Sequence, residues 1–289
     1  MHVTGEVPAS VHAALAESFT LVDRAEGADG ILSLLTTRVD EELLDRAGPQ
    51  LRVVANYGVG VDNVDLAAAR SRNVLIANTP DVLTDAVAEL TIALTLALLR
   101  RVAEGDRFLR RRGEWAFSLE FMLGETLRGK MFGVVGPGRI GRAAASLAEG
   151  LGARTASAGR GGDLGALLET ADVVSLHVPL TAETRHLIDA QALARMRPTA
   201  VLVNTARGLI VDERALVAAL CDGTIAGAAL DVYEHEPDVS PELLELDNVV
   251  LTPHIASATR DTREAMGMLA VDALRAVLVE GRTPANVVP

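Results

Sequence analysis

The chain has 289 residues. Because a single hydrophobic core stops growing near about 250–300 residues, we expect two domains. An apolar share of 49% and a charged share of 23% are typical of a globular protein and exclude a disordered or collagen-like class. The formal net charge of −12 repels phosphate backbones and anionic lipid, which argues against nucleic acid or a membrane surface as a partner.

The basic run Arg110–Arg112 is a local exception to the acidic charge, and we interpret it as a solvated helix end or loop. Cys221 is the only cysteine, so no intrachain disulfide can form, which fits a reducing compartment. The N-terminus lacks a basic region followed by an apolar core. The longest apolar stretch, residues 90–99, is well below the roughly 18 residues of a bilayer span, so we expect a cytoplasmic protein.

The first eighty residues predict three short strands, at residues 30–35, 51–55 and 74–77. A long helical pattern follows at residues 84–101 and another lies at residues 259–280. We interpret these two helices as the connections by which the chain leaves a first domain and later returns to it.

Short β-rich runs alternate with helical patterns from Lys130 onward. The predicted strands are residues 131–135, 173–178, 200–204, 227–232 and 249–252, with helices such as 142–150 and 212–222 between them. This alternation indicates parallel strands joined by crossover helices. The expected fold is therefore α/β, with two Rossmann-like doubly wound domains. The smaller, built from both termini, comprises residues 1–83 and 260–289, and the larger comprises residues 84–259.

A glycine-rich loop follows the strand at residues 131–135 and reads Gly136-Pro-Gly138-Arg139-Ile140-Gly141. Its three glycines would allow a tight turn, a close approach of the backbone to a pyrophosphate, and close packing of the next helix on the strand. A lone GxGxxG is weak evidence, but between a strand and a helix it indicates a dinucleotide site. The larger domain is therefore expected to bind the dinucleotide and the smaller one the substrate.

About twenty residues beyond the first glycine, an acidic side chain usually binds the ribose of NAD, whereas an arginine suits the 2′-phosphate of NADP. Here Gly159 occupies the expected acidic position and Arg160 follows it, which favours NADP over NAD. Asp163 is the alternative ribose ligand if the preceding strand is longer than expected, and Arg160 would then be merely exposed.

Three polar groups lie at or just past predicted strand ends, where ligands bind in open α/β sheets. They are Arg207, Glu236 and His254. Reduction of a keto acid needs a cation for the carboxylate, an acid for the nascent alkoxide, and a carboxylate that keeps this acid protonated. The three residues supply one of each.

The sequence resembles the D-2-hydroxyacid dehydrogenase family across nearly its whole length, because several segments match that family in the same order. The matching segments are residues 54–65 (VANYGVGVDNVD), the GPGRIG loop, HVPLT at 177–181, VNTARG at 203–208, ALDVYEHEP at 229–237 and LTPHIASAT at 251–259. The segments Gly113-Glu-Trp115 and Phe121-Met-Leu-Gly124, together with Ser257, look most like the glyoxylate/hydroxypyruvate reductase branch. The resemblance implies an enzyme that uses NAD(P)H and a small 2-keto acid.

The resemblance also implies a role for each site residue. His254 would be the general acid, Glu236 its buried partner, and Arg207 the group that holds the substrate carboxylate. The backbone N–H groups of Val59 and Gly60 would bind that carboxylate from the other domain, with Ser257 also at the substrate. The cofactor set would comprise Gly136, Gly138, Arg139, Ile140, Gly141, Gly159, Arg160, His177, Val178, Pro179, Thr205, Ala206, Arg207, Asp231 and His254, with Asp231 on the nicotinamide carboxamide and His177 to Pro179 on the adenine side.

Neighbouring residues leave some alternatives open. Glu234 and His235 lie beside Glu236, but the family pattern places the acid directly before the proline. The remaining histidines show no metal-ligand spacing, so no metal site is expected. Trp115 would be interface packing, or it would reach a neighbouring subunit's substrate pocket. Residues 90–99 form a nearly all-round apolar helix, which must be buried by more than one neighbour. The resembling family pairs its nucleotide domains through this region, so we expect a homodimer.

Other functions share this fold. The main alternative is a non-catalytic NAD(H)-sensing regulatory protein, and a 3-phosphoglycerate-type dehydrogenase is another. Phosphite-oxidising relatives use a lysine near the Gly-Val-Gly segment, which is absent here, and formate-oxidising relatives have Gln where Glu236 stands. The sequence also departs from the family in its short segment between Arg160 and the strand at residue 173, where a helix or an edge strand should be missing. The N-terminal domain looks abbreviated as well.

Overall fold

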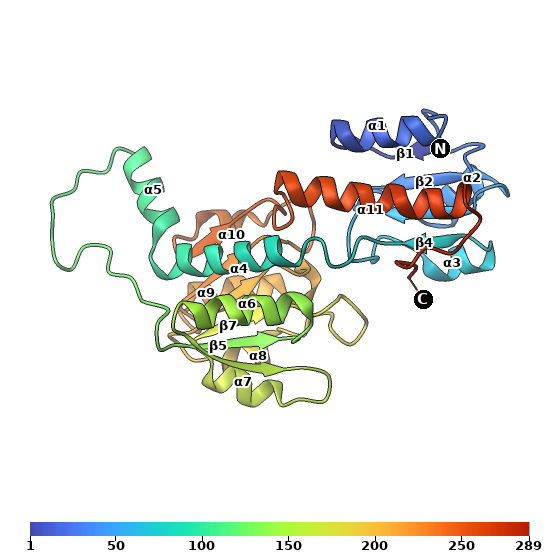
Figure 1. The fold of residues 1–289 in the computed structure, drawn as a ribbon. Coiled ribbons are helices and arrows are strands. Elements are labelled where there is room, and N and C mark those ends of the chain that lie inside the picture. Colours follow the sequence, from blue (N-terminus) through green and yellow to red (C-terminus); the bar gives the residue numbers. More distant parts are fainter. Residues whose placement is uncertain (289) are drawn as a thin grey trace. The chain divides into compact units, whose positions relative to one another are not determined.

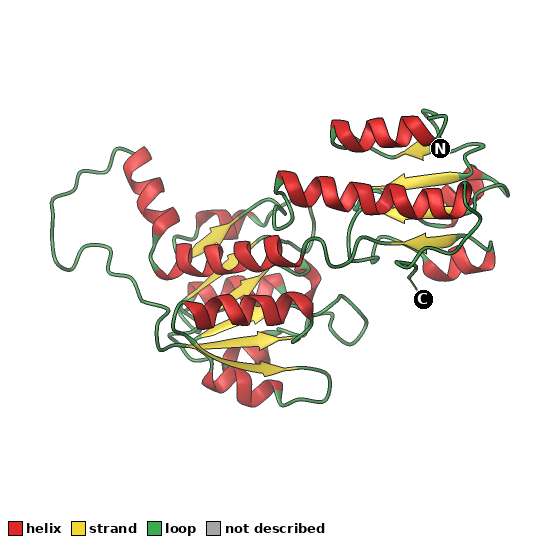
Figure 2. Cartoon of the chain, in the orientation of Figure 1, coloured by secondary structure: helices red, strands yellow, loops and turns green. Residues whose placement is uncertain are grey.

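The computed structural model describes residues 1–288 and divides into two compact units (Figure 1 and Figure 2). The first unit comprises Met1–Leu83 together with the chain from Ser257 onward, and the second comprises Thr84–Ala256. The boundary expected from the sequence, at 259/260, lies three residues beyond the observed return (260 − 257). Each unit is built around its own parallel sheet.

The sheet of the first unit has the strand order β1-β2-β3-β4 within the described residues, and all its pairs are parallel. Its strands are β1 (His2–Val3), β2 (Gly30–Ser33), β3 (Val53–Asn56) and β4 (Leu75–Ala77), and its helices are α1 (Ala9–Ser18), α2 (Glu41–Ala47), α3 (Leu66–Ser71) and α11 (Arg260–Leu278). The three predicted strands are confirmed. The sequence did not reveal β1, because a strand of two residues has no measurable periodicity.

The sheet of the second unit has the order β10-β9-β8-β7-β5-β6 among the described residues, again entirely parallel. Its strands are β5 (Met131–Val135), β6 (Arg154–Ala158), β7 (Val173–Leu176), β8 (Val201–Asn204), β9 (Gly227–Leu230) and β10 (Val249–Leu251). Its helices are α4 (Thr84–Leu99), α5 (Val102–Arg110), α6 (Arg139–Gly150), α7 (Leu164–Thr170), α8 (Ala190–Arg195), α9 (Glu213–Cys221) and α10 (Pro241–Glu245), with a 3-10 turn η1 (Gly208–Ile210). The five predicted strands are confirmed within two residues at either end.

Aspartate caps explain where many of the helices begin. The side chains of Asp40, Asp65, Asp163, Asp189 and Asp212 each accept a hydrogen bond from the N–H group three residues later. This bond satisfies one of the N–H groups that have no partner inside the helix. The caps fix the point at which the chain turns from a strand-end loop into the next helix.

Strand β6 is the outer strand of its sheet, since no strand described for residues 1–288 pairs with its far edge. In the doubly wound fold that binds dinucleotides, the strand at this position is itself flanked by a further strand. The short connection from β6 to β7 carries α7 alone. The predicted loss of an edge strand beside Arg160 is therefore confirmed.

Helix α4 is partly covered within its own unit, because it packs against α6 and against β8, β9 and β10. Ala88, Thr91, Leu94 and Thr95, which recur at helical spacing, are fully or almost fully buried there. Leu90, Leu96, Ala97 and Leu98 are only half-buried, so part of the apolar surface of residues 90–99 stays uncovered within one chain. The homodimer expected from this helix stays a prediction.

The second unit exposes a basic helix end and the cysteine of the chain. Arg110 ends α5 and is exposed together with Arg111 and Arg112, as expected for a solvated helix end. Cys221 is exposed at the end of α9. None of the helices between residues 1 and 288 combines the length and the apolar character needed to cross a membrane.

Candidate active site

The glycine loop after β5 has the geometry that a pyrophosphate requires. Gly136 has φ +91°, and a Cβ there would lie 2.8 Å from the carbonyl oxygen of His177. A Cβ on Gly141 would lie 2.4 Å from the carbonyl oxygen of Gly136, so only glycine lets α6 pack this closely. Gly138 caps α6, and a Cβ there would meet nothing within 4 Å. The open N-terminus of α6, which begins with Arg139 and Ile140, fits a dinucleotide phosphate.

The strand-end loop after β6 contains the residues expected to select the cofactor. The strand ends at Ala158, and Gly159 and Arg160 are exposed directly after it. Asp163 is the cap of α7, and its Oδ1 accepts a hydrogen bond of 2.9 Å from the N–H of Ala166. The strand is therefore not longer than expected, and the carboxylate of Asp163 is engaged in starting a helix.

His177, Val178 and Pro179 follow β7 beside the glycine loop. The Nε2 atom of His177 lies 2.8 Å from the hydroxyl of Ser175. Burial lowers the pKa of His177 to about 4, so the ring is neutral at neutral pH. If His177 lines the adenine pocket of the cofactor, as the family resemblance implies, its neutral ring adds no charge to that pocket.

The turn after β8 is held by a buried asparagine. Asn204 donates from Nδ2 to the carbonyl oxygen of Arg207 at 2.9 Å, and its Oδ1 accepts from the N–H of Ala206 at 3.0 Å. The hydroxyl of Thr205 lies 2.9 Å from that of Thr91 on α4. The two side chains fix the turn that presents Arg207. The next residue must be glycine, because a Cβ at Gly208 would lie 1.9 Å from the backbone of Tyr233.

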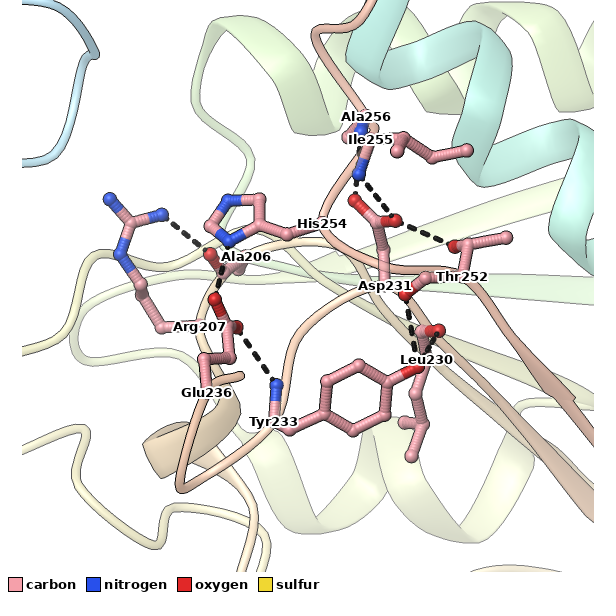
Figure 3. Close-up of polar contacts among 10 residues, drawn as sticks. All are labelled: Ala206, Arg207, Leu230, Asp231, Tyr233, Glu236, Thr252, His254, Ile255 and Ala256. Atoms are coloured by element: carbon pink, nitrogen blue, oxygen red, sulfur yellow. Dashed lines mark hydrogen bonds and ion pairs between the residues drawn. The ribbon is translucent and has the colours of Figure 1, made fainter. Parts of the chain in front are cut away.

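Asp231 organises the turn that carries His254, and its carboxylate is fully buried. It accepts hydrogen bonds from the hydroxyl of Thr252 at 2.6 Å and from the N–H groups of Ile255 and Ala256 at 2.8 Å each (Figure 3). The N–H of His254 donates to the carbonyl oxygen of Asp231 at 2.8 Å. Within this turn His254 has φ +53°, a left-handed conformation that non-glycine residues seldom adopt. The predicted contact of Asp231 with a carboxamide stays a prediction.

His254 and Glu236 form a pair, with Nδ1 of the imidazole 2.7 Å from Oε2 of the carboxylate. The other carboxylate oxygen accepts from the N–H of Tyr233 at 3.0 Å (Figure 3). Glu236 was expected to be buried, and that expectation is wrong, since its side chain is 34% exposed and that of His254 is 33% exposed. The cause is the position of Glu236 in the loop beyond β9, where the backbone rather than the core holds it.

The surroundings of Glu236 favour its charged form. Burial raises the pKa of Glu236, but the hydrogen bonds from His254 and from the Tyr233 N–H, together with the charges of His254 and Arg207, outweigh this effect. The pKa of Glu236 is therefore below its ordinary value. The guanidinium of Arg207 also donates from Nη1 to the carbonyl oxygen of Ala206 at 2.8 Å. Figure 3 shows Arg207, Glu236 and His254 gathered at one end of the sheet.

Comparison with known proteins decides the family. Residues 92–256 match the family described as D-isomer specific 2-hydroxyacid dehydrogenase, NAD binding domain. A glyoxylate reductase from Thermococcus litoralis is 46% identical over 287 residues, which cover 93% of this chain and 86% of that protein. The chain belongs to the D-2-hydroxyacid dehydrogenase family. It is accordingly an oxidoreductase that uses a nicotinamide cofactor.

Solved structures of the D-2-hydroxyacid dehydrogenase fold agree closely with this chain. The TT0316 protein from Thermus thermophilus is 44% identical with a TM-score of 0.94, covering 100% of this chain and 99% of that one. An NADPH-dependent glyoxylate/hydroxypyruvate reductase from Sinorhizobium meliloti, solved with NADP and malonate, is 38% identical with a TM-score of 0.86. The match covers 99% of this chain and 95% of that one. The α/β fold of two Rossmann-like parts is thus confirmed.

Glu234, the acidic residue two positions before Glu236 in this dehydrogenase, makes different contacts from Glu236. Oε1 of Glu234 lies 2.8 Å from Nε2 of His186, out of line for a hydrogen bond, and accepts from the N–H of Glu213 at 3.1 Å. The N–H of Glu234 donates to the carboxylate of Glu213 at 3.2 Å. The sequence offered no signal for this link between α9 and the loop. The contacts with Glu213 occupy Glu234, so Glu236 is the partner of His254, as the motif predicted.

Several other supporting residues were not predicted from the sequence of this dehydrogenase. Asn204 and Thr91 hold the Arg207 turn, and the hydroxyl of Tyr233 donates to the carbonyl oxygen of Thr252 at 2.9 Å. Burial and the nearby charge of Asp231 raise the pKa of Tyr233 to about 12, so it stays a donor.

In residues 1–288, no group of three or more metal-ligating side chains is placed to hold a metal ion. Val59, Gly60 and Ser257 belong to the first unit, and their contact with substrate stays a prediction.

The lowered pKa of Glu236 has a consequence for stability. Because the folded state favours the carboxylate, this group contributes stability that is present above its unfolded pKa of about 4.3 and is lost as the pH falls through the lower folded value. Glu236→Gln should therefore lower the free energy of unfolding near neutral pH by about 1 kcal/mol or less, because the pair is partly exposed, and the melting temperature should fall with it. The difference from wild type should shrink toward pH 3. Thermal unfolding across this pH range measures it. Glu17→Gln on the exposed face of α1 is the control, and an equal loss from Glu236→Gln at every pH would contradict the assignment.

Proposed function

We propose that this dehydrogenase reduces small 2-keto acids, glyoxylate and hydroxypyruvate among them, to the corresponding D-2-hydroxy acids. The observation that carries the proposal is the His254–Glu236 pair at 2.7 Å beside Arg207, at the carboxyl end of a dinucleotide-binding sheet. The names of the relatives support the choice of substrate, since several are glyoxylate reductases and one is a glyoxylate/hydroxypyruvate reductase.

His254 acts as the general acid in this proposal. Its Nδ1 faces the carboxylate of Glu236, so Nε2 is the ring nitrogen left to donate a proton to the oxygen of the reacting carbonyl. Glu236 orients the imidazole through its contact with Nδ1 and keeps a negative charge beside the ring. When bound, the nicotinamide cofactor supplies the hydride for the carbonyl carbon.

Arg207 supplies the positive charge that a keto acid requires. Its guanidinium would bind the substrate carboxylate and polarise the carbonyl, as charge-assisted hydrogen bonds of an arginine do. The family resemblance adds the backbone N–H groups of Val59 and Gly60 as further donors, and Ser257 as a further substrate contact. These assignments follow the family resemblance and the strand-end positions of the residues.

The first prediction of this proposal concerns His254→Ala. Removal of a general acid typically lowers kcat by about 10²–10⁴-fold, whereas the affinity for NADPH should change little because the lost group acts on the developing alkoxide. Steady-state oxidation of NADPH in the presence of glyoxylate or hydroxypyruvate measures kcat, and tryptophan or cofactor fluorescence measures the affinity.

His235→Ala is the matched control, because His235 lies in the same loop as Glu236 and its side chain is 79% exposed. This variant should keep wild-type kcat. A His254→Ala enzyme with kcat within threefold of wild type would overturn the role of His254. A wild-type protein that binds NADPH but reduces neither keto acid would favour the sensing function instead.

We infer that the preferred cofactor is NADPH. Gly159 puts no acidic group at the position that would repel a 2′-phosphate, Arg160 is exposed beside it, and the carboxylate of Asp163 caps α7. Arg160 is also close enough to Glu183 to contribute to the lowering of its pKa, which is due mainly to Thr181 and the Glu183 backbone. Arg160 itself follows Gly159 after the end of β6, in the strand-end loop where a 2′-phosphate would enter.

The pair Gly159→Asp and Arg160→Ala should reverse the preference toward NADH, since it introduces a repulsion and removes an attraction. The Gly159→Asp change fits the backbone, because a Cβ there would lie 3.3 Å from the ring of Pro137 and need only a small shift. Ratios of kcat/KM for NADPH and NADH report the result. Arg154→Ala on the same edge strand is the control, and a wild-type preference for NADH that survives Arg160→Ala would reject the inference.

We propose a homodimer that forms through the segment 102–123. The segment leaves the body of the second unit as α5 and a long loop (Figure 1). It exposes large apolar side chains, namely Val102, Leu109, Trp115, Phe117, Leu119, Phe121 and Leu123, with Phe117 at 85% and Leu119 at 82%. Exposed apolar side chains that gather on one segment mark an interaction surface. A second copy of the chain is the occupant that the family resemblance favours.

Light scattering coupled to gel filtration should give the mass of a dimer at micromolar concentration. Phe117→Ser with Leu119→Ser should shift the protein toward the monomer, because burial of each such side chain contributes about 1.5–3 kcal/mol. Leu244→Ser removes a side chain that is 61% exposed on α10 and serves as the control. A monomeric wild-type protein would contradict the proposal.

A further inference from the structure

The loop after β3, residues 58–61, is held from behind by side-chain amides. The carbonyl oxygen of Val59 accepts a hydrogen bond of 2.8 Å from Nδ2 of Asn78, and that of Gly60 accepts one of 2.8 Å from Nδ2 of Asn56. Two successive peptide groups are therefore fixed in orientation, although the segment belongs to neither a helix nor a strand.

The carbonyl oxygen of Gly58 is fixed in the same way, because it accepts from the N–H of Thr79 at 2.9 Å. In a trans peptide group the C=O and the N–H point in opposite directions. Each anchored carbonyl therefore turns the following N–H, on Val59, Gly60 and Val61, away from its anchor. In the part of the chain that the structure describes, none of these three N–H groups donates to another residue.

Consecutive N–H groups without protein acceptors are suited to an anionic oxygen. All three lie in half-buried residues, so a ligand oxygen can reach them while their surroundings exclude part of the water. The orientation of these groups decides how well they serve a carboxylate. That orientation depends on the donors that hold the carbonyls.

Asn78 is itself held by the C-terminal segment of the chain. Its N–H donates to the carbonyl oxygen of Asn286 at 3.1 Å, and its carbonyl oxygen accepts from Nδ2 of Asn286. The segment continues along β4, where Ala77 forms an antiparallel bridge with Val287. Both polar groups of the Asn78 backbone are thus bound by one residue more than two hundred positions away in the sequence.

Asn56 has more support from its surroundings than Asn78. Its Oδ1 accepts from the hydroxyl of Ser33 and from Nδ2 of Asn63, at 3.0 Å each, and its side chain is fully buried. Asn78 is half-buried, and its Nδ2 is the donor that reaches the Val59 carbonyl. A change at Asn78 therefore alters one peptide group while the buried network around Asn56 stays intact.

We propose that Asn78, fixed by Asn286, is a positioning residue that turns the N–H of Gly60 toward the carboxylate of the keto acid. The proposal rests on the proposed function for the identity of the ligand. It gives the C-terminal residues 286–288 a role in substrate binding that their distance in sequence does not suggest.

Asn78→Asp is the first test, because it keeps the shape of the side chain and replaces the donor by an oxygen that repels the Val59 carbonyl. The KM for glyoxylate should rise about tenfold, the effect of one lost hydrogen bond to a charged group. The kcat should change less than about threefold, because the carboxylate is bound alike in the ground state and in the transition state. The KM for NADPH should stay at its wild-type value.

Asn286→Ala is the second test and leaves Asn78 in place. It should raise the KM for glyoxylate in the same direction, because the Asn78 backbone loses the donor that holds its carbonyl. Asn248→Asp is the matched control, since Asn248 also donates to backbone carbonyls, those of Leu220 and Ala226 at 3.3 Å each, but lies in the second unit. Thermal unfolding of all three variants separates a loss of folding from a loss of positioning.

Calorimetric titration of the NADPH-loaded protein with oxalate, a two-carbon dicarboxylate, measures the site independently of turnover. The oxalate affinity should fall about tenfold in Asn78→Asp. A wild-type protein that binds oxalate in this Asn78-dependent way but does not reduce keto acids would overturn the proposed function and uphold the positioning role. Glyoxylate KM and oxalate affinity within twofold of wild type in both Asn78→Asp and Asn286→Ala would overturn the positioning role. A wild-type protein without keto-acid turnover or oxalate binding would overturn both.

Discussion

The buried carboxylate of Asp231 is the group on which the geometry of the site depends. An ionised group without access to water must be fully hydrogen-bonded, and Asp231 obtains its donors from the turn 252–256. That turn cannot relax without leaving a buried charge unpaired. The left-handed conformation of His254 is thereby maintained, and the imidazole meets Glu236 at 2.7 Å.

The same principle recurs at the other strand ends. Parallel strands deliver polar residues to one edge of a sheet, but the loops beyond them have no ladder of hydrogen bonds to fix their direction. Buried amides replace that ladder, with Asn204 behind the Arg207 turn and Asn56 with Asn78 behind the loop 58–61. The reactive groups are thus presented by loops whose backbone is fixed from the protein side, which leaves their outer groups available to ligands.

The sequence predicted what depends on local pattern and missed what depends on distant partners. The strands of both sheets and the GxGxxG turn follow from periodicity and from glycine, and Arg207, Glu236 and His254 follow from strand-end motifs. The exposure of Glu236, the pairing of Asn286 with Asn78 and the link from Glu234 to His186 arise only when remote segments meet. The packing of α4 on β8, β9 and β10 likewise joins segments that are a hundred residues or more apart.

Asp231 acts through the placement of His254, and a double-mutant cycle tests this role most directly. The three variants are Asp231→Asn, His254→Ala and the double variant, each assayed for kcat with NADPH and a keto acid. In Asp231→Asn an amide NH₂ group replaces one carboxylate oxygen, so the side chain can no longer accept hydrogen bonds from both N–H groups of the turn at its two ends. If Asp231 serves to place His254, the double variant should be no slower than His254→Ala alone, since the effects of residues that act as a unit do not add. Losses that multiply would contradict the account and show that Asp231 acts independently of His254.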